Sequence, residues 1–242
     1  MGAAQAAAYL CARSLPFVAG QLLVVGTAHV MELALPLERV LRTFDPDVVA
    51  LELDPQRWVA LRAPVRPRRG PLLLQLLASL QERLGEILGA PPGSDMLAAG
   101  RTAQRLGARL ALVDLPVIPT LQRAWRALGW RERLALAREL LPPLLGAEAL
   151  ESGPAAGENP PATGDFSREL AEFARRFPSL QRELIDRRDR HMARRLVALM
   201  RDGQRVAAVV GEGHLSGLER RLACLSPEVV PLQRLLTLRG NG

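Results

Sequence analysis

Four side chains able to do acid–base or metal chemistry follow short apolar runs of this sequence. His29 and His214 are two of only three histidines in the chain, and each comes three residues after a glycine that ends such a run. Glu52 lies late in a third run and Asp114 comes directly after a fourth. Two imidazoles with one or two carboxylates are a common set of ligands for a divalent metal such as Zn, Mn or Co. They predict a site where a metal-held water is acidified and a carbonyl group is polarised.

The same residues also have an ordinary structural interpretation. Histidines at the ends of strands often do no more than satisfy loop hydrogen bonds, and a carboxylate there often caps a loop. This alternative stays open on the residues alone.

The apolar runs predict the elements that would position these groups. Buried parallel strands are expected at 21–25, 48–53, 109–113 and 206–210, with an edge strand near Val229. Segments with helical spacing separate them, which predicts an α/β fold with a mainly parallel sheet and flanking helices. Ligands of such sheets bind beyond the carboxyl ends of the strands, where the four side chains above are expected.

The middle of the chain is mostly helical, which predicts one domain with an inserted helical subdomain. We expect a leader over 1–20, an α/β domain over 21–220 with the helical insert at about 63–201, and a tail over 221–242. Residues 151–164 (ESGPAAGENPPATG) are rich in Gly, Pro and Ala and predict a flexible loop within the insert.

Composition argues against several functions. The net charge of the 242-residue chain is +7, but the basic residues are scattered among acidic ones and have no interleaved aromatics, so no nucleic-acid partner is expected. The stretch 186–195 is expected to be a charged, solvated helix face, and the alternative is that Arg188 or Asp189 points toward the site at the strand ends. No dinucleotide, phosphate-loop or serine-hydrolase motif is present, and no apolar run is long enough to span a membrane.

Cysteine usage and the N-terminus bear on the compartment. Cys11 and Cys224 form no motif and no secretory signal is evident, which favours reduced thiols and a cytoplasmic location. A peripheral place at a membrane and a homo-oligomeric state remain open.

Several motifs, in this order along the chain, resemble the TraB/PrgY family of pheromone-shutdown and TraB-domain proteins. They are VVGTAHV (24–30), PDVVALELDPQR (46–57), GSDMLAAG (93–100), VDLPVIPTLQRAW (113–125), LIDRRDRHMA (184–193) and VVGEGHLSGL (209–218). The family is grouped with Tiki proteases, erythromycin esterases and haem-binding ChaN proteins, which share paired Gly-x-x-His motifs. The resemblance therefore implies an erythromycin-esterase- or ChaN-like fold and a metal-dependent hydrolase or peptidase.

The resemblance also implies roles for individual residues. His29, His214 and Glu52 would bind the metal, and Glu52, Arg188 and Asp189 would have catalytic roles. The positions that it implies for substrate binding are Gly26, Asp95, Asp114, Thr120, Gly211 and Gly213. From the residues alone, Asp95 is expected to be a helix N-cap.

Three positions depart from the family pattern. Arg187 stands where the family usually has Glu, Leu115 where it has Arg, and Asp95 where it has Glu. The first hypothesis is a metal-dependent hydrolase that acts on a peptide or on a small molecule. In a more specific form of this hypothesis, the peptide is a signalling peptide. The departures favour the alternative, a non-catalytic regulatory protein that sequesters a peptide on the same fold. Tetrapyrrole binding is a third hypothesis, by analogy with ChaN.

Overall fold

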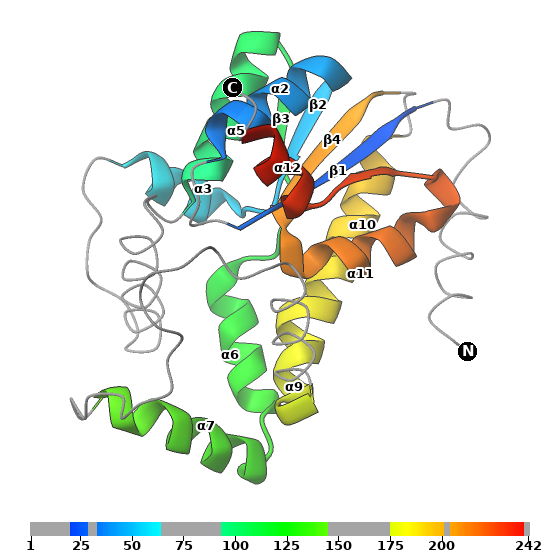
Figure 1. Ribbon diagram of the computed structural model, residues 1–242. Helices are drawn as coiled ribbons and strands as arrows, with labels where there is room; N and C mark the ends of the chain where they lie inside the picture. The colour runs from blue at the N-terminus through cyan, green and yellow to red at the C-terminus, as the bar shows by residue number, and fades with distance from the viewer. Residues whose placement is uncertain (1–19, 29–32, 64–92, 145–174, 201–203, 240–242) are drawn as a thin grey trace. The chain divides into compact units, whose positions relative to one another are not determined.

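A computed structural model describes residues 20–28, 33–63, 93–144, 175–200 and 204–239. The chain forms two compact units (Figure 1), one made by the described residues up to Val117 and from Arg188 onward, the other by those between Ile118 and Arg187. Most of the expected leader and all of the expected loop 151–164 lie outside the described residues. The expected domain boundaries stay predictions.

The first unit is built on a five-stranded sheet in which all paired strands are parallel, as the alternation of strands and helices predicts. The strand order is β3-β2-β4-β1-β5. The strands are β1 (Leu22–Thr27), β2 (Val48–Leu51), β3 (Arg109–Leu112), β4 (Val206–Gly211) and β5 (Glu228–Val230). Every residue of β1, β2 and β4 is buried, which is why these strands are continuous apolar runs rather than alternating ones.

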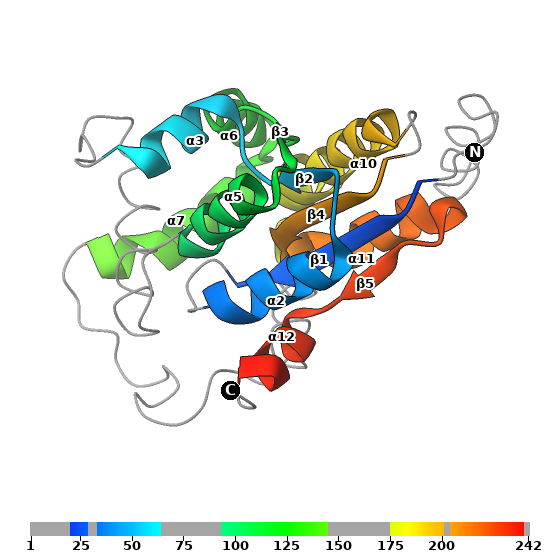
Figure 2. The same cartoon turned by 90° about the horizontal axis from the view of Figure 1, so that it is seen from above.

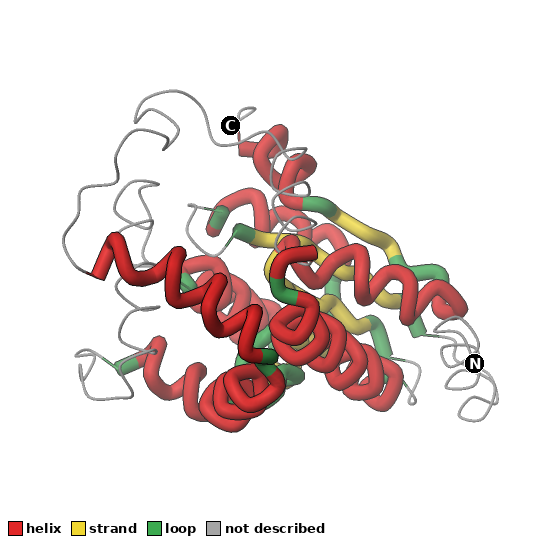
Figure 3. Tube along the Cα trace, turned by 90° about the horizontal axis from the view of Figure 1, so that it is seen from below, coloured by secondary structure: helices red, strands yellow, loops and turns green. Residues whose placement is uncertain are grey.

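Helices cover both faces of this sheet (Figures 2 and 3). They are α2 (Ala34–Phe44), α3 (Pro55–Arg62), α5 (Ser94–Leu106), α11 (Glu212–Leu222), α12 (Leu232–Arg239) and, from Arg188 onward, α10 (Arg187–Leu199). Because side chains alternate along a strand, odd-numbered residues of β1, β2 and β4, such as Val25, pack with α2, α5 and α12. Even-numbered residues of these three strands, such as Val24, pack with α10 and α11. In β3 and β5 the numbering is reversed, since Leu110 and Val230 lie on the side of α2, α5 and α12. This alternation decides which helices a side chain at a strand end can reach.

The chain leaves β2 through a helix that the sequence pattern did not predict. The strand expected over 48–53 ends at Leu51, although the Glu52 backbone N–H still pairs with the Val209 carbonyl oxygen at 3.1 Å. Asp54 then caps α3, since its Oδ1 accepts hydrogen bonds from the backbone N–H groups of Gln56 (2.8 Å) and Arg57 (3.1 Å). Glu52 is thus held between a paired strand and a capped helix.

The end of the chain adds to the same sheet and core. β5 pairs with β1 and confirms the edge strand expected near Val229. Helix α12, which was not expected, buries Leu235 in the core cluster that includes Val230. Cys224 is disulfide-bonded, so the expectation of reduced thiols is wrong for this residue.

The second unit has its own small core. It contains α6 (Val117–Ala127) from Ile118 onward, α7 (Trp130–Leu144), α9 (Pro178–Leu180) and the π-helical turn η1 (Gln181–Asp186). Its buried apolar residues are Ala124, Leu128, Phe177 and Leu180. Within the described parts of the chain, no helix is long and apolar enough to cross a bilayer.

Candidate functional site

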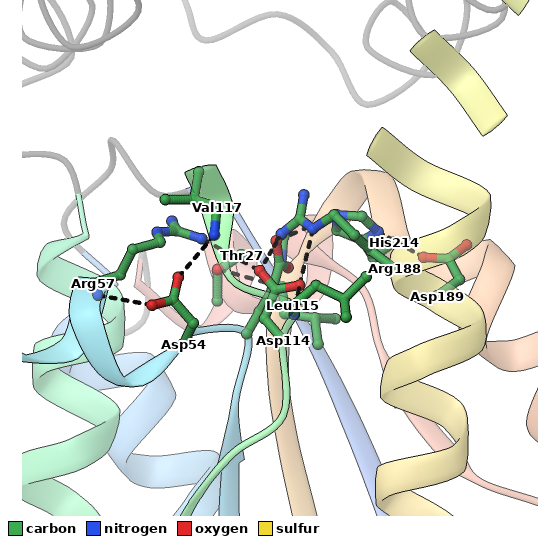
Figure 4. A network of polar contacts seen from close by, with 12 residues as sticks. Thr27, Asp54, Arg57, Asp114, Leu115, Val117, Arg188, Asp189 and His214 are labelled. Atoms are coloured by element: carbon green, nitrogen blue, oxygen red, sulfur yellow. Dashed lines mark hydrogen bonds and ion pairs between the residues drawn. The ribbon is translucent and has the colours of Figure 1, made fainter. Parts of the chain in front are cut away.

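The carboxyl ends of the parallel strands bring polar side chains of the first unit together (Figure 4). Thr27 ends β1, Glu52 follows β2 and Asp114 lies two residues beyond β3. Glu52, at an even-numbered position, lies on the side of α10 and α11, whereas Thr27 lies on the side of α5. One sheet edge therefore carries a polar cluster on each face.

Glu52 is at the centre of the cluster on the α10 and α11 side. Its side chain is buried, with an exposed fraction of 5%. Oε2 accepts a hydrogen bond of 2.6 Å from the backbone N–H of Gly211, at the end of β4. Oε1 lies 2.5 Å from Arg188 Nη2 and 3.2 Å from His214 Nε2. The carboxylate is therefore fixed by the neighbouring strand on one oxygen and faces two cationic groups with the other.

Arg188 links Glu52 to Asp114. Its Nε donates to Asp114 Oδ1 at 2.9 Å and its Nη2 to Asp114 Oδ2 at 2.7 Å, a two-point contact that fixes the guanidinium plane. Asp114 Oδ1 also accepts from the backbone N–H of Leu115 at 2.7 Å, and Arg57 approaches Oδ2 at 3.4 Å. Burial would lower the pKa of Arg188, but the Glu52 and Asp114 carboxylates raise it above its usual value. The charge of Arg188 is thus permanent.

His214 lies in the first turn of α11 and is held through both ring nitrogens. Asp189 Oδ1 is 2.6 Å from Nδ1, and Glu52 Oε1 faces Nε2. Burial lowers the pKa of His214, but the Glu52 charge and the hydrogen bonds to Asp189 and Glu52 outweigh burial and the Arg188 charge and raise it to about 9. At neutral pH the ring is an imidazolium that donates to both carboxylates.

A second buried pair lies on the other face of the sheet edge. The Thr27 hydroxyl donates to Asp95 Oδ2, and Thr27 Oγ1 also lies 3.3 Å from the Val210 carbonyl oxygen. Asp95 is 1% exposed, and its Oδ1 accepts from the backbone N–H of Met96 at 2.8 Å. The expectation of an Asp95 N-cap is wrong, because Gly93 occupies the N-cap position of α5 with a φ of 82°. Asp95 instead anchors α5 to the end of β1.

The family model of the TraB/PrgY/gumN family matches residues 19–228. The chain belongs to the TraB/PrgY/gumN family. A protein of Methanocaldococcus jannaschii described as uncharacterized is 30% identical over 213 residues, which cover 82% of this chain and 52% of that protein. The chain thus spans about half the length of the curated relative that it matches.

Most residues that the TraB/PrgY resemblance singled out lie at this sheet edge. The network on the α10 and α11 side joins Glu52, Asp114, Arg188, Asp189, Gly211 and His214. Asp95 lies on the other face, and Thr120 is buried in the second unit, which is described apart from this site. His29 lies outside the described residues. The roles proposed for these residues stay predictions.

Two of these family positions also correct an expectation from charge patterning. The segment 186–195 was expected to be a solvated face, but Asp189 is 1% exposed and Arg188 holds two buried carboxylates. Arg187 pairs with Glu183 at 3.3 Å within the second unit. Neighbouring arginines of one helix therefore have unrelated partners, because successive residues are turned by about 100°.

Sequence reasoning did not single out several residues of the network, although some had a signal. Asp54, followed by Pro55, matches the pattern of an N-cap with proline at the first helical position. Its Oδ2 also accepts from the backbone N–H of Val117 at 3.3 Å. Thr27, Arg57 and Arg221 had no such signal, because only the packing of distant segments brings them to Asp95, Asp114 and Asp189.

The geometry can also be tested against the metal that the family resemblance implies. Among the residues that the structure describes, no three His, Cys, Asp or Glu side chains form a group that could hold a metal ion. Two potential ligand atoms nevertheless have a separation that suits two ligands of one metal ion, since Nε2 of His214 and Oε1 of Glu52 are 3.2 Å apart. Two bonds of about 2.1 Å at angles of about 90–110° separate their donor atoms by about 3.0–3.4 Å. The described residues therefore form no metal site by themselves, and the spacing of this pair, which is that of a hydrogen bond, is also compatible with two ligands of one metal ion.

Proposed function

We propose that this protein is a divalent-metal-dependent hydrolase that cleaves a peptide bond at the carboxyl edge of the sheet. His214 and Glu52 are two of the ligands and His29 is the third. The observation that carries the proposal is the arrangement of His214, with Nε2 at 3.2 Å from Glu52 Oε1 and Nδ1 at 2.6 Å from Asp189. Histidines that bind metals commonly donate their other N–H to a carboxylate in this way.

The space between Nε2 of His214 and Oε1 of Glu52 is suited to a positive charge. At neutral pH a proton on the ring fills this role, because the pKa of His214 is raised to about 9. A metal ligand must be a neutral imidazole, so the metal and this proton compete for one place. Metal binding by the pair is therefore expected to strengthen as the pH rises.

The residues of the chain orient the ligands and balance their charge. Asp189 holds the His214 ring through Nδ1, and the Gly211 N–H fixes Oε2 of Glu52 so that Oε1 is presented to the site. Arg188 places its positive charge beside Glu52 and joins Glu52 to Asp114. When bound, a divalent metal supplies acidification of water and polarisation of the scissile carbonyl. Mn, Co and Zn are the candidate metals.

A peptide is the substrate class that the family resemblance favours, and a signalling peptide is the more specific form of this hypothesis. A small molecule is the alternative substrate. The described site is compatible with amide hydrolysis, because its buried carboxylates and imidazole are groups that transfer protons or bind metals. Leu115 stands where the family usually has Arg, but Asp114 still has cationic partners, since both Arg57 and Arg188 contact it.

The alternative function is a regulatory protein that binds a peptide without cleaving it. It is favoured by one contact, because Arg188 Nη2 lies 2.5 Å from the same Glu52 oxygen that a metal would use. A network completed by its own arginine would be a structural element, and ligand binding would then use the surface around it.

Metal analysis of the purified full chain separates the two proposals. We expect about one equivalent of Mn, Co or Zn per chain at pH 8 after incubation and desalting, lost in His29→Ala and in His214→Ala. His191→Ala is the matched control, because His191 is the remaining histidine of the sequence and is outside the described network. Metal retained by His214→Ala, or no metal in the wild type, would refute the hydrolase proposal and favour the binding protein.

The second experiment measures cleavage of a mixed peptide library. We expect cleavage by the metal-loaded wild type and by His191→Ala, and none by Glu52→Gln. Cleavage that persists in Glu52→Gln would place the chemistry elsewhere.

A further inference from the structure

Asp189, whose Oδ1 contacts His214, lacks a hydrogen-bond donor among the described residues at its other carboxylate oxygen, Oδ2. The guanidinium of Arg221 lies close to this oxygen, with Nη1 3.8 Å from Oδ2. An oxygen of a buried carboxylate without a donor is costly, so its position must be enforced by its surroundings.

Gly217, one turn of α11 after His214, provides the space for this carboxylate. A methyl group on Gly217 would overlap Asp189 Oδ2 and lie 2.7 Å from Cγ. The backbone does not explain the glycine, because Gly217 is not among the described residues with positive φ. A glycine inside a helix costs about 1 kcal/mol relative to alanine. The close approach of Asp189 is therefore the reason for glycine at this position.

Arg221 is connected to both residues. Its Nη1 donates to the Gly217 carbonyl oxygen at 3.1 Å and so lies one helical turn beyond the glycine, next to Oδ2. Its side chain is 22% exposed, so the charge acts in a partly desolvated place. The backbone of Gly217 thus holds the guanidinium, and the missing side chain of Gly217 admits the carboxylate.

We propose that Gly217 and Arg221 are positioning residues that hold the Asp189 carboxylate against α11 and so aim its Oδ1 at His214. Gly217 acts by leaving space, and Arg221 acts by supplying the opposite charge. The consequence for catalysis, a fixed direction of His214 Nε2, rests on the proposed function. The positioning itself depends only on the described contacts.

The first test reads the His214–Asp189 hydrogen bond directly. The downfield proton resonance of His214 Nδ1–H at pH 7 is assigned by its loss in His214→Ala. We expect Gly217→Ala and Arg221→Gln to shift or abolish this resonance and Arg221→Lys to restore it. Arg220→Gln, an exposed neighbour on the same helix, is the matched control and leaves it unchanged. An unchanged resonance in both Gly217→Ala and Arg221→Gln would overturn the proposal.

The second test asks whether the clash is with Asp189 in particular. We expect Gly217→Ala to lower the Tm of the wild type but to raise that of Asp189→Ala, where the gain in helix propensity is no longer opposed. An equal loss of Tm in both backgrounds would overturn the steric argument. Neither test uses metal or peptidase activity, so failure of the hydrolase proposal leaves the positioning result intact, and the reverse also holds.

Discussion

Replacement of Arg188 by alanine is expected to be among the most damaging changes to the first unit. Arg188 makes three charged hydrogen bonds, two to Asp114 and one to Glu52, and its side chain is 17% exposed. Both carboxylates are buried, with side-chain exposed fractions of 2% and 5%. Removing one partner of a buried ion pair costs about 3–5 kcal/mol when the remaining charge is uncompensated, and the charges of His214 and Arg57 beside the two carboxylates place the expected loss at the lower end of this range. We expect a loss of this size in the free energy of unfolding at pH 7.

Arg187→Ala is the matched control from the adjacent position. Its partner Glu183 lies four residues before it, and the two side chains are 33% and 23% exposed. A partly exposed pair of this kind, with no buried carboxylate, contributes less than about 1 kcal/mol. The two substitutions remove the same chemical group from neighbouring positions, so their difference isolates the network.

Urea denaturation followed by circular dichroism at pH 7 measures both variants. A deficit below about 1 kcal/mol at pH 7, equal to that of Arg187→Ala, would refute the view that Arg188 neutralises buried carboxylates.

Three further predictions concern other parts of the sheet edge. The pKa of His214 is raised from 6.5 to about 9, so the protonated ring stabilises the folded state by on the order of 3 kcal/mol. This contribution is fully present below pH 6.5 and is lost as the pH rises through 9. A free energy of unfolding that is flat from pH 7 to 10, relative to that of His214→Gln, would contradict this. Thr27→Val removes a donor from buried Asp95 and should cost about 1–3 kcal/mol by thermal unfolding; an unchanged Tm would show that Asp95 does not depend on the hydroxyl. Gly26→Ala should lower the Tm by a few degrees, because the methyl group would overlap Glu212 Oε2, which accepts from the backbone N–H of Leu232; in Glu212→Ala the same change should be tolerated, and an equal loss there would argue against the overlap.

The sheet could be predicted from the sequence because parallel strands covered on both faces are continuous apolar runs. The runs that became β1, β2 and β4 have no exposed residue. Their carboxyl ends share one edge in any parallel sheet, so Glu52 and the turn that carries His214 could be placed near each other before the structure was known. The parallel arrangement therefore follows from local pattern and the topology rules for such sheets.

Helix α3 shows where local pattern is too weak. Its eight residues bury none of their side chains, so no apolar stripe marks it. Its start is decided by the Asp54 cap and Pro55, a short signal next to a strand whose end is itself hard to place.

Only the tertiary structure decided which partners the charged residues have. The resemblance to the family singles out Arg188 rather than Arg187 for a place at the site, but the sequence does not say which carboxylates Arg188 meets. The answer depends on contacts between residues distant in the chain, such as Arg188 with Glu52 and Asp189 with His214. Electrostatic interactions of this kind depend on distance and burial, which the packing of α10 and α11 on β4 determines. The sequence alone thus determined the sheet and the edge where its polar residues gather, and the packed helices determined which of those residues form one network.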